Sequence, residues 1–396
     1  MAAEASGPVT DPAPDRPADA VAGPGADRPA DDPVADLVRG VAALTEGERP
    51  WCAGAVVSAG RGTGTLAEEA FGWAVRYAGY DPDTDRGVEL PAAARVPADT
   101  GTLFDLASLT KLFTAVVAVW CVERGTLDLD GQVAAYAPEY GAAAAHRITV
   151  RQLLTHTSGL RPELPLYACP GPAERLAMLR AEEPTAPPGT GRRYSDLNLL
   201  ILQGVLERIT GQPLDRLVAE VITGPLGMRD TCFRPPPALR PRVAATEDQR
   251  RPWAKLDRGM LRGEVHDENA HALGGVAGHA GLFATAGDLA RLCRALLGGG
   301  THEGVRVLRP GSVDLLLTAP GLGFEVDQPW FMGGLAGRGA AGHTGFTGTS
   351  LVIDRATDSY LVLLANTVHP RRRPGDSAPR AAAGTALARL LRAGDG

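Results

Sequence analysis

The stretch Phe104-Asp-Leu-Ala-Ser-Leu-Thr-Lys111 places a serine, Ser108, three positions before a lysine, Lys111. From Ser108 to Arg124 the chain is strongly apolar and has neither glycine nor proline, and Gly125 follows, so we predict a helix that begins at Ser108. In such a helix Lys111 lies one turn along on the same face, within reach of the serine hydroxyl. A serine hydroxyl is a weak nucleophile until a base removes its proton, and a buried lysine amine can act as that base. The stretch therefore predicts a nucleophile, Ser108, with Lys111 as its proton-handling partner.

Lysine is rare in this chain. Of the 40 residues that are lysine or arginine, only Lys111 and Lys255 are lysine. The abundance of Ala, Gly, Pro and Arg indicates a GC-rich coding sequence, in which arginine replaces lysine wherever either will serve. Arginine keeps its proton at any usable pH, whereas a buried lysine can lose it. A retained lysine is therefore a candidate for chemistry.

Length and composition limit the possible organisation. The chain has 396 residues, of which 44% are hydrophobic, and it can bury a large core in one domain or two lobes. Its formal net charge of -6 argues against a nucleic-acid partner. No run approaches about 18 apolar residues, so we expect no membrane span. No Leu, Ile or Phe precedes Leu37, so the apolar stretch of an export signal is missing and we expect a cytoplasmic protein.

The cysteines agree with that location. They are widely spaced and none forms a CxxC pair: Cys52, Cys121, Cys169, Cys232 and Cys293. The odd number and the spacing fit buried thiols in a reducing compartment better than a disulfide framework or a zinc site.

The chain divides into a tail and one catalytic domain. Residues 1–33 are rich in Pro, Ala and Asp and cannot bury enough apolar surface to fold, so we predict a disordered tail. Residues 34–396 form a single domain, with an α/β lobe at about 34–107 and 286–396 and a mostly helical lobe at about 108–285.

Local patterns predict the elements of this domain. The predicted helices cover 34–46, 108–124, 196–210 (ended by Gly211), 285–297 (opened by the box Thr285 to Asp288) and 381–392. The predicted strands are 55–57 and 71–77 around a glycine turn at 60–64, and the antiparallel pair 349–354 and 359–365. Strands at both ends of the domain predict an α/β (α+β) fold, in which an antiparallel sheet is built from both termini and flanked by helices.

Five stretches, in order, resemble a known superfamily. They are Ser108-Leu-Thr-Lys111, Leu153-Leu-Thr-His-Thr-Ser-Gly-Leu160, Tyr194-Ser-Asp196, the segment from Leu273-Gly-Gly to Asp288-Leu-Ala-Arg291, and His343-Thr344-Gly345. Together they resemble the motifs of the serine β-lactamase and penicillin-binding-protein superfamily, and most of all its class C β-lactamase and family VIII esterase branch. The resemblance covers about 50–370 and implies the β-lactamase/transpeptidase-like fold.

The resemblance also implies roles for individual residues. Ser108 would attack an acyl carbonyl, while Lys111 and Tyr194 share the proton transfers. The backbone N–H groups of Ser108 and Phe346 would form the oxyanion hole. Thr344 and Gly345 would lie with His343 on the strand beside the nucleophile and support substrate binding. No metal or organic cofactor is implied.

Two positions depart from the superfamily pattern. Asp196 stands where an asparagine is usual. It either pairs with Lys111 and raises the lysine pKa, or only caps the following helix and leaves Asn198 as the nearby amide. His343 stands where a lysine is usual, and a neutral imidazole holds a substrate carboxylate less well, which favours uncharged esters or amides.

Further histidines precede the late helix. His266, His271 and His279 share a glycine-rich stretch with Asp267 and Glu268, but their spacing fits no standard metal site. We expect this loop to line the entrance of the active site. We expect His156 to hold its own loop by hydrogen bonds.

The sequence thus predicts a serine hydrolase that acts on small ester or amide substrates, with weak or no β-lactamase activity. An acyl or peptidyl transferase using the same site is the nearest alternative. A D,D-peptidase and a non-catalytic binding protein are less favoured, the first because its substrate lies outside the membrane and the second because Ser108, Lys111 and Tyr194 are intact. No G-x-S-x-G motif supports a Ser-His-Asp hydrolase. The expected partner is a small acyl substrate, with neither nucleic acid nor membrane, and the sequence leaves the oligomeric state open.

Overall fold

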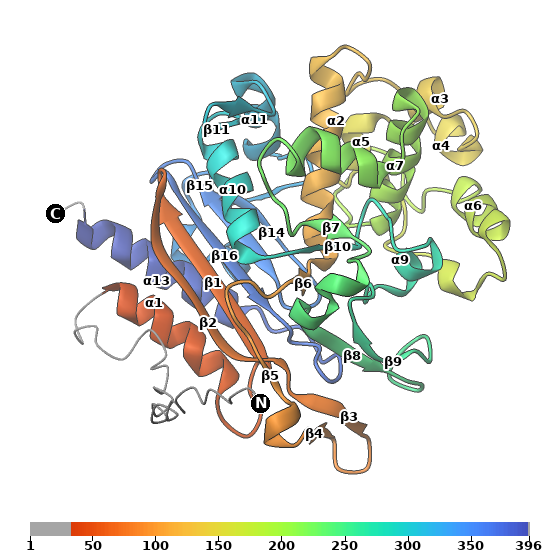
Figure 1. Cartoon of the computed structure of the whole chain (residues 1–396). Coiled ribbons are helices and arrows are strands. Elements are labelled where there is room, and N and C mark those ends of the chain that lie inside the picture. Colours follow the sequence, from red (N-terminus) through yellow and green to blue (C-terminus); the bar gives the residue numbers. More distant parts are fainter. Residues whose placement is uncertain (1–32, 395–396) are drawn as a thin grey trace, which may run out of the picture.

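A computed structural model describes residues 33–394, and its centre is a seven-stranded antiparallel sheet (Figure 1). Its strands, in spatial order, are β13 (Glu325–Val326), β14 (Ala341–Thr344), β15 (Ser350–Asp354), β16 (Ser359–Ala365), β1 (Gly54–Arg61), β2 (Gly64–Val75) and β5 (Val96–Pro97). β1 pairs with β16, and Val57 lies opposite Leu363. The predicted assembly of the sheet from both ends of the domain is confirmed.

The two central strands are buried on both faces of the sheet. Val57 and Leu363 point into an apolar cluster with α1 (Pro33–Ala42) and α13 (Ala378–Gly394), which cover one face. Their neighbours Val56 and Leu364 belong to the cluster on the other face, where α10 (Ala286–Leu297) packs. Alternate residues thus serve two cores, as the two-residue period of a strand requires.

The helical lobe surrounds α2 (Thr110–Glu123), which is buried almost all round. The helix α7 (Asp196–Thr210) packs on it, as do α8 (Leu214–Val218) and α11 (Pro310–Leu317). The other α-helices in the described part of the chain are α3 (Val133–Tyr136), α4 (Gly141–Ala145), α5 (Val150–Leu154), α6 (Pro172–Arg180), α9 (Glu268–Ala272) and α12 (Pro329–Met332). None of the helices within residues 33–394 combines the length and apolar character needed to span a bilayer.

The prediction that the first catalytic helix begins at Ser108 is wrong by two residues. Ser108 lies in a 3₁₀ turn, Ala107–Leu109, and α2 begins at Thr110. Ala107, the residue before the predicted start, has a left-handed backbone with φ +45°, so the helix cannot extend back through it. Residues 107–109 form the 3₁₀ turn that leads into α2.

Other predicted elements are confirmed with small changes. α7 has the predicted bounds, and Gly211 closes it in the left-handed conformation with φ +69°. Thr285 caps α10 by accepting a hydrogen bond from the N–H of Asp288. α13 begins at Ala378, three residues before the predicted start. Of the predicted tail at 1–33, all but the last residue lies outside the described part of the chain.

Several strands of two to five residues were not predicted, because so short a stretch shows no clear alternation of apolar and polar residues. The strand predicted at 71–77 covers the end of β2 and the start of another hairpin. The additional strands are β3 (Tyr77–Asp81) with β4 (Arg86–Glu89), β8 (Ala245–Gln249) with β9 (Gly259–Arg262), β11 (Thr301–His302) with β12 (Val305–Arg306), and the sheet β6 (Phe104–Asp105), β10 (Leu282–Ala284), β7 (Cys232–Phe233). The strand β6 leads directly into the Ser108 turn, so its pairing with β10 helps to position that turn.

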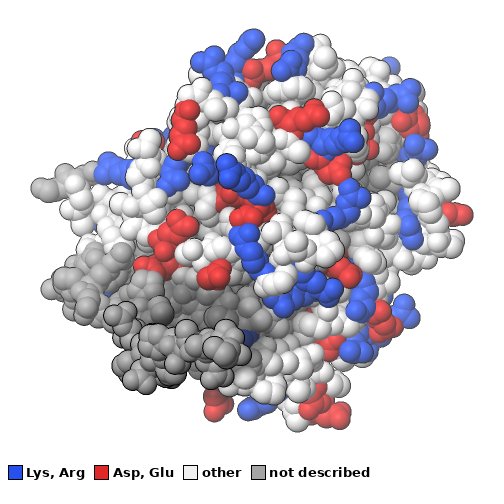
Figure 2. Space-filling view, viewed as in Figure 1, with Lys and Arg blue, Asp and Glu red and all other residues white. Residues whose placement is uncertain are grey.

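The charges visible on one face of the molecule are mixed. In Figure 2, basic and acidic side chains lie interspersed over the part of that face not covered by grey atoms. Over that area the surface is therefore not dominated by one sign of charge.

Candidate active site

Ser108 and Lys111 are in direct contact. The Lys111 Nζ donates a hydrogen bond to the Ser108 Oγ over 2.7 Å. Lys111 is fully buried, whereas Ser108 is partly exposed. The pair is therefore a buried amine beside a hydroxyl that a ligand can reach, which is the arrangement that the sequence spacing predicts.

The turn that carries Ser108 is held by a residue that the sequence analysis missed, Asp105. Its buried carboxylate accepts a hydrogen bond from the N–H of Ala107 over 2.8 Å and another from the N–H of His266 over 2.6 Å. The first bond closes a side-chain turn over Asp105 and Leu106, and so fixes the backbone that enters the Ser108 turn. The backbone oxygen of Asp105 also accepts a bond from the Thr347 hydroxyl over 2.6 Å. In the sequence, the signal for this role of Asp105 was its position two residues before Ala107, a turn residue that is not glycine.

Asp196 pairs with Lys111, and this resolves the first of the two departures. Its Oδ1 lies 2.8 Å from the Lys111 Nζ. Asn198 points elsewhere: its amide nitrogen contacts the Nδ1 of His156 over 3.0 Å and its oxygen accepts a bond from the Ser158 hydroxyl over 2.6 Å. Asp196 therefore forms an ion pair with Lys111, while Asn198 holds the loop that contains His156 and Ser158.

The protonation of this cluster follows from its charges. Burial lowers the pKa of Lys111, but the Asp196 carboxylate and the Tyr194 side chain raise it, and the net result is a raised pKa. Burial raises the pKa of Tyr194 more than the neighbouring Lys111 charge lowers it. At neutral pH the resting site thus holds a lysine cation and a neutral tyrosine. This pair must lose one proton before it can accept the proton of Ser108.

Tyr194 is enclosed by two histidine rings. Its ring centroid lies 4.7 Å from that of His156 and 5.8 Å from that of His343, and the Lys111 Nζ lies 4.7 Å from it. The His156 Nδ1 accepts the N–H of Ser195 over 3.1 Å, so this histidine holds its loop as expected. The tyrosine ring is therefore fixed beside both Lys111 and the strand that carries His343.

His343 is a neutral imidazole on β14. Its Nδ1 contacts the backbone oxygen of Thr344 over 2.7 Å, and because that oxygen can only accept, Nδ1 carries the hydrogen. Burial and the nearby Lys111 charge lower the pKa of His343 to about 3. This position therefore carries no positive charge at neutral pH.

The residues after His343 approach the Ser108 turn closely. The Gly345 N–H donates to the Thr349 oxygen over 2.7 Å, and a Cβ on Gly345 would lie 2.4 Å from the oxygen of Leu106. Only glycine fits there. The Phe346 side chain that follows is 56% exposed and stacks on the His266 ring, with 5.5 Å between centroids.

Two cavities meet at Ser108, and Tyr194 and Phe346 line both of them. The larger has a volume of about 710 Å³ and includes His343, Thr344, Gly345, Trp51, Trp330 and Arg380. The smaller has a volume of about 210 Å³ and includes Asp196, His266, Asp267 and His279. A substrate bound at Ser108 thus has two compartments of different size for its two halves.

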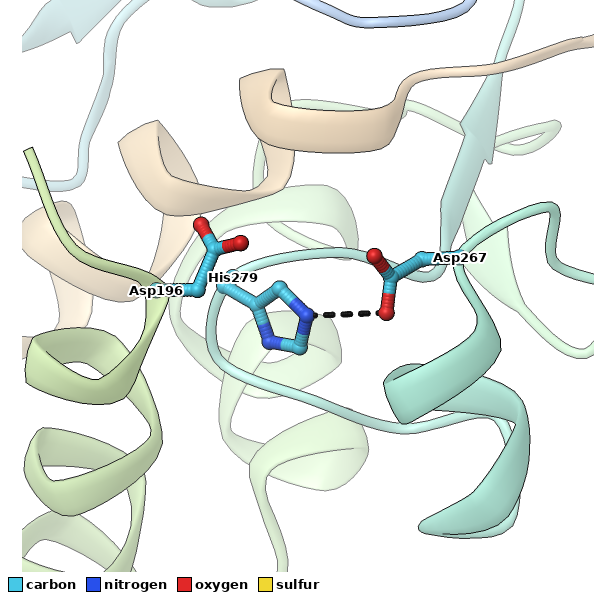
Figure 3. A group of neighbouring side chains, drawn as sticks. All are labelled: Asp196, Asp267 and His279. Carbon is cyan, nitrogen blue, oxygen red and sulfur yellow. Dashed lines mark hydrogen bonds and ion pairs between the residues drawn. The ribbon is translucent and has the colours of Figure 1, made fainter. Parts of the chain in front are cut away.

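Only two of the three clustered histidines reach the site. His266 and His279 are buried and line the smaller cavity, whereas His271 is exposed on α9. Figure 3 shows the His279 ring between Asp196 and Asp267, with its Nε2 bonded to the Asp267 carboxylate over 3.0 Å. These three residues offer ligand atoms within 4.8 Å of one another, but Asp196 is already neutralised by the Lys111 ammonium, which makes the group a poor cation site.

Comparison with known proteins identifies relatives over most of the chain. The family model described as Beta-lactamase matches residues 34–385. A protein of Escherichia coli (strain K12) named "Putative D-alanyl-D-alanine carboxypeptidase" is 34% identical over 70% of this chain and 73% of its own. Among solved structures, a class C beta lactamase has a TM-score of 0.68 at 20% identity, over 91% of this chain and 97% of its own. "EstCE1, a hydrolase with promiscuous acyltransferase activity" has a TM-score of 0.64 at 21% identity, over 92% and 99%.

Removal of the Asp196 charge will shift the pH at which Ser108 becomes reactive. In Asp196→Asn the Lys111 pKa loses its main raising influence, while burial still lowers it. We expect the rate of Ser108 labelling by a fluorophosphonate to rise with pH, and its midpoint to move about one to three units lower in the variant. Asp314→Asn, a loss of an exposed charge on α11, is the matched control. An unmoved midpoint in Asp196→Asn would show that this carboxylate does not govern the proton.

Proposed function

The chain belongs to the beta-lactamase family, and from this premise we propose that it is a serine hydrolase that forms an acyl-enzyme on Ser108 with small ester or amide substrates. The observation that carries the proposal is the 2.7 Å bond between the fully buried Lys111 amine and the accessible Ser108 hydroxyl. Lys111 is held in place by Asp196 and lies against the ring of Tyr194, so a proton can pass within a fixed set of groups.

Acylation begins when the Lys111–Tyr194 pair has lost one proton. The pair takes the proton of Ser108 as the Oγ attacks the acyl carbon, and a C–O bond forms to give a tetrahedral oxyanion. The pair, through Tyr194, then returns the proton to the leaving alcohol or amine as its bond to carbon breaks. In the second half, water attacks the acyl-enzyme, its proton passes to the same pair, and the released Ser108 regains a proton as the acid leaves.

The oxyanion needs fixed donors beside Ser108. We assign this role to the backbone N–H groups of Ser108 and Phe346, each commonly worth roughly 3–4 kcal/mol in similar sites. The contacts of Asp105 and Gly345 support this assignment, because they fix the turn before Ser108 and the strand end before Phe346. Thr344 and Gly345 then form the wall along which the substrate lies.

Loss of the nucleophile or its partner will abolish ester turnover. For p-nitrophenyl butyrate we expect Ser108→Ala to reach the uncatalysed background and Lys111→Arg to lose about a hundredfold or more in kcat, because arginine cannot give up its proton. The change in absorbance at each substrate concentration measures this. Asp314→Asn is the control, since this exposed residue of α11 lines neither cavity. Equal turnover by wild type and Ser108→Ala would end the proposal.

The proposed preference for substrates other than β-lactams rests on His343. Because this imidazole is neutral, we expect benzylpenicillin to acylate Ser108 slowly compared with p-nitrophenyl butyrate. His343→Lys should raise the rate of benzylpenicillin acylation by about tenfold, since an ammonium binds the carboxylate by a charge-assisted bond. Intact-protein mass spectrometry follows the adduct, and His343→Gln is the neutral control. Rapid penicillin turnover by the wild type would contradict the expectation.

Acyl transfer is the second candidate function. It is supported by the printed activity of EstCE1 and by the volume of the larger cavity, about 710 Å³, which leaves room for an acceptor. In that reaction an alcohol or amine, rather than water, takes the acyl group from Ser108. We expect added short alcohols to divert part of the butyryl group into new esters, as chromatography of the products would reveal. Butyric acid as the sole product at every alcohol concentration would rule out transfer.

A cytoplasmic location is part of the proposal, and a D,D-peptidase activity is the less favoured alternative. Five free cysteines, four of them buried, support a cytoplasmic location, where thiols stay reduced. The name of the Escherichia coli relative supports an amide substrate that ends in D-alanine. Cell fractionation and D-alanine release from a D-Ala-D-Ala peptide test these two points separately.

A further inference from the structure

We propose that Arg380, in the first turn of the C-terminal helix α13, is a positioning residue for the oxyanion hole. In this role its guanidinium holds the peptide unit between Gly345 and Phe346 so that the Phe346 N–H faces the acyl oxygen at Ser108. The inference rests on the proposed function, because it concerns the same reaction. It gives a part in that reaction to a helix that contributes none of the other proposed site residues.

Arg380 is a buried cation without a close counter-ion. Its side chain is 7% exposed, none of the ion pairs within residues 33–394 includes it, and its Nε has no hydrogen-bond partner there. Burial lowers its pKa to about 10, against a smaller raising effect of the Asp376 carboxylate, so the guanidinium is charged at neutral pH. A buried charge without a close opposite charge destabilises a fold, so its remaining contacts point to a role for the cation itself.

The contacts of Arg380 lead to one peptide unit. Its Nη2 donates a hydrogen bond to the backbone oxygen of Gly345 over 3.0 Å, and its Nη1 donates to the Ser377 hydroxyl over 3.0 Å. The guanidinium carbon lies 5.4 Å from the ring centroid of Trp51, which steadies the side chain from another direction. The Gly345 oxygen accepts a second bond from the Gly348 N–H over 3.1 Å. Two donors thus fix the direction of this carbonyl.

The other end of the same peptide unit is the Phe346 N–H. In a planar trans peptide the N–H and C=O groups point in opposite directions, so a fixed Gly345 oxygen also fixes this N–H. The Phe346 N–H has no acceptor among residues 33–394, and Phe346 lines both cavities together with Ser108. The Gly345 backbone lies against the Ser108 turn, since a Cβ on it would be 2.4 Å from the oxygen of Leu106. A free donor is therefore held beside the nucleophile, where negative charge develops.

The charge of Arg380 adds to this geometry. A cation bonded to a carbonyl oxygen polarises the peptide and strengthens its N–H as a donor. Because arginine keeps its proton, it does so without entering the proton transfers of Lys111 and Tyr194. The acyl oxygen carries its full charge only in the tetrahedral state, so the contribution of Arg380 belongs to kcat rather than to KM.

Binding of a substrate anion is the competing role, because Arg380 also lines the larger cavity. Each of its Nη atoms already donates a bond, and its Nε is buried. A substrate carboxylate would therefore have to compete with the Gly345 oxygen or the Ser377 hydroxyl for the guanidinium. The contacts in the structure thus favour the peptide as the partner of Arg380.

The test removes the cation and measures kcat and KM separately for an uncharged ester. In Arg380→Met we expect kcat for p-nitrophenyl butyrate to fall about ten- to hundredfold and KM to stay within about threefold, because the hole acts on the transition state. Arg380→Lys keeps the charge and should retain part of the lost rate. Arg389→Met, the same substitution at an exposed position of α13, is the matched control and should leave both constants unchanged.

Inhibition by butaneboronic acid gives a second readout. This acid forms a tetrahedral adduct with a serine that resembles the intermediate, so its Ki should rise in Arg380→Met by about the factor by which kcat falls. A purely structural role would not link the two changes. Thermal unfolding checks the fold of every variant. Should Arg380→Met fail to fold, Arg380→Gln, which is polar and also uncharged, should show the same linked losses.

The outcomes distinguish this inference from the proposed function. An unchanged kcat in folded Arg380→Met or Arg380→Gln would overturn the role of Arg380 alone. So would a change in KM only, or a loss confined to 4-carboxyphenyl butyrate, whose leaving group is an anion, because either result would make Arg380 a substrate-binding residue. If the wild type hydrolyses neither ester faster than Ser108→Ala, the proposed function itself fails.

Discussion

The buried ammonium of Lys111 is the constraint around which the rest of the structure is arranged. A charge removed from water destabilises a fold by several kcal/mol unless it is paired and hydrogen-bonded. Here the partners are the Asp196 carboxylate, the Ser108 hydroxyl and the backbone oxygen of His279 at 3.3 Å. They come from the start of α7, the turn before α2 and the loop before β10, so these three segments must meet within hydrogen-bonding distance.

The two lobes meet at the same place. On the helical side, the Asp105 carboxylate ties the turn to His266. On the sheet side, the hydroxyls of Thr347 and Thr349 bond the backbone oxygens of Asp105 and Leu106. The nucleophile is thus attached to both lobes by short polar contacts. Rigid support of this kind keeps a reactive group in position without help from the substrate.

The sequence predicts the parts of the structure that depend on local chemistry. The bounds of α7 follow from its apolar run and from Gly211, and the contact of Ser108 with Lys111 follows from helical spacing. The start of α2 does not, because a left-handed Ala107 and a 3₁₀ turn precede it, and no propensity of alanine reveals this.

The choice between Asp196 and Asn198 shows a second limit of the sequence. Both lie in the first turn of α7, and which one meets Lys111 depends on the direction in which each side chain leaves the helix. The lining of the smaller cavity is equally hidden in the sequence. Glu163, Asp196 and Asp267 come from separate parts of the chain and share a wall only after folding.

The pairing of β1 with β16 has a consequence for the order in which parts of this protein fold during synthesis. The partner of Val57 is Leu363, so the centre of the sheet joins residues that leave the ribosome far apart in time. During synthesis the apolar face of β1 must wait for nearly the whole polypeptide, whereas α2, α5, α7 and α8 can associate as soon as they emerge. Nascent chains will therefore carry a helical body and an unfinished sheet until the last strands are translated.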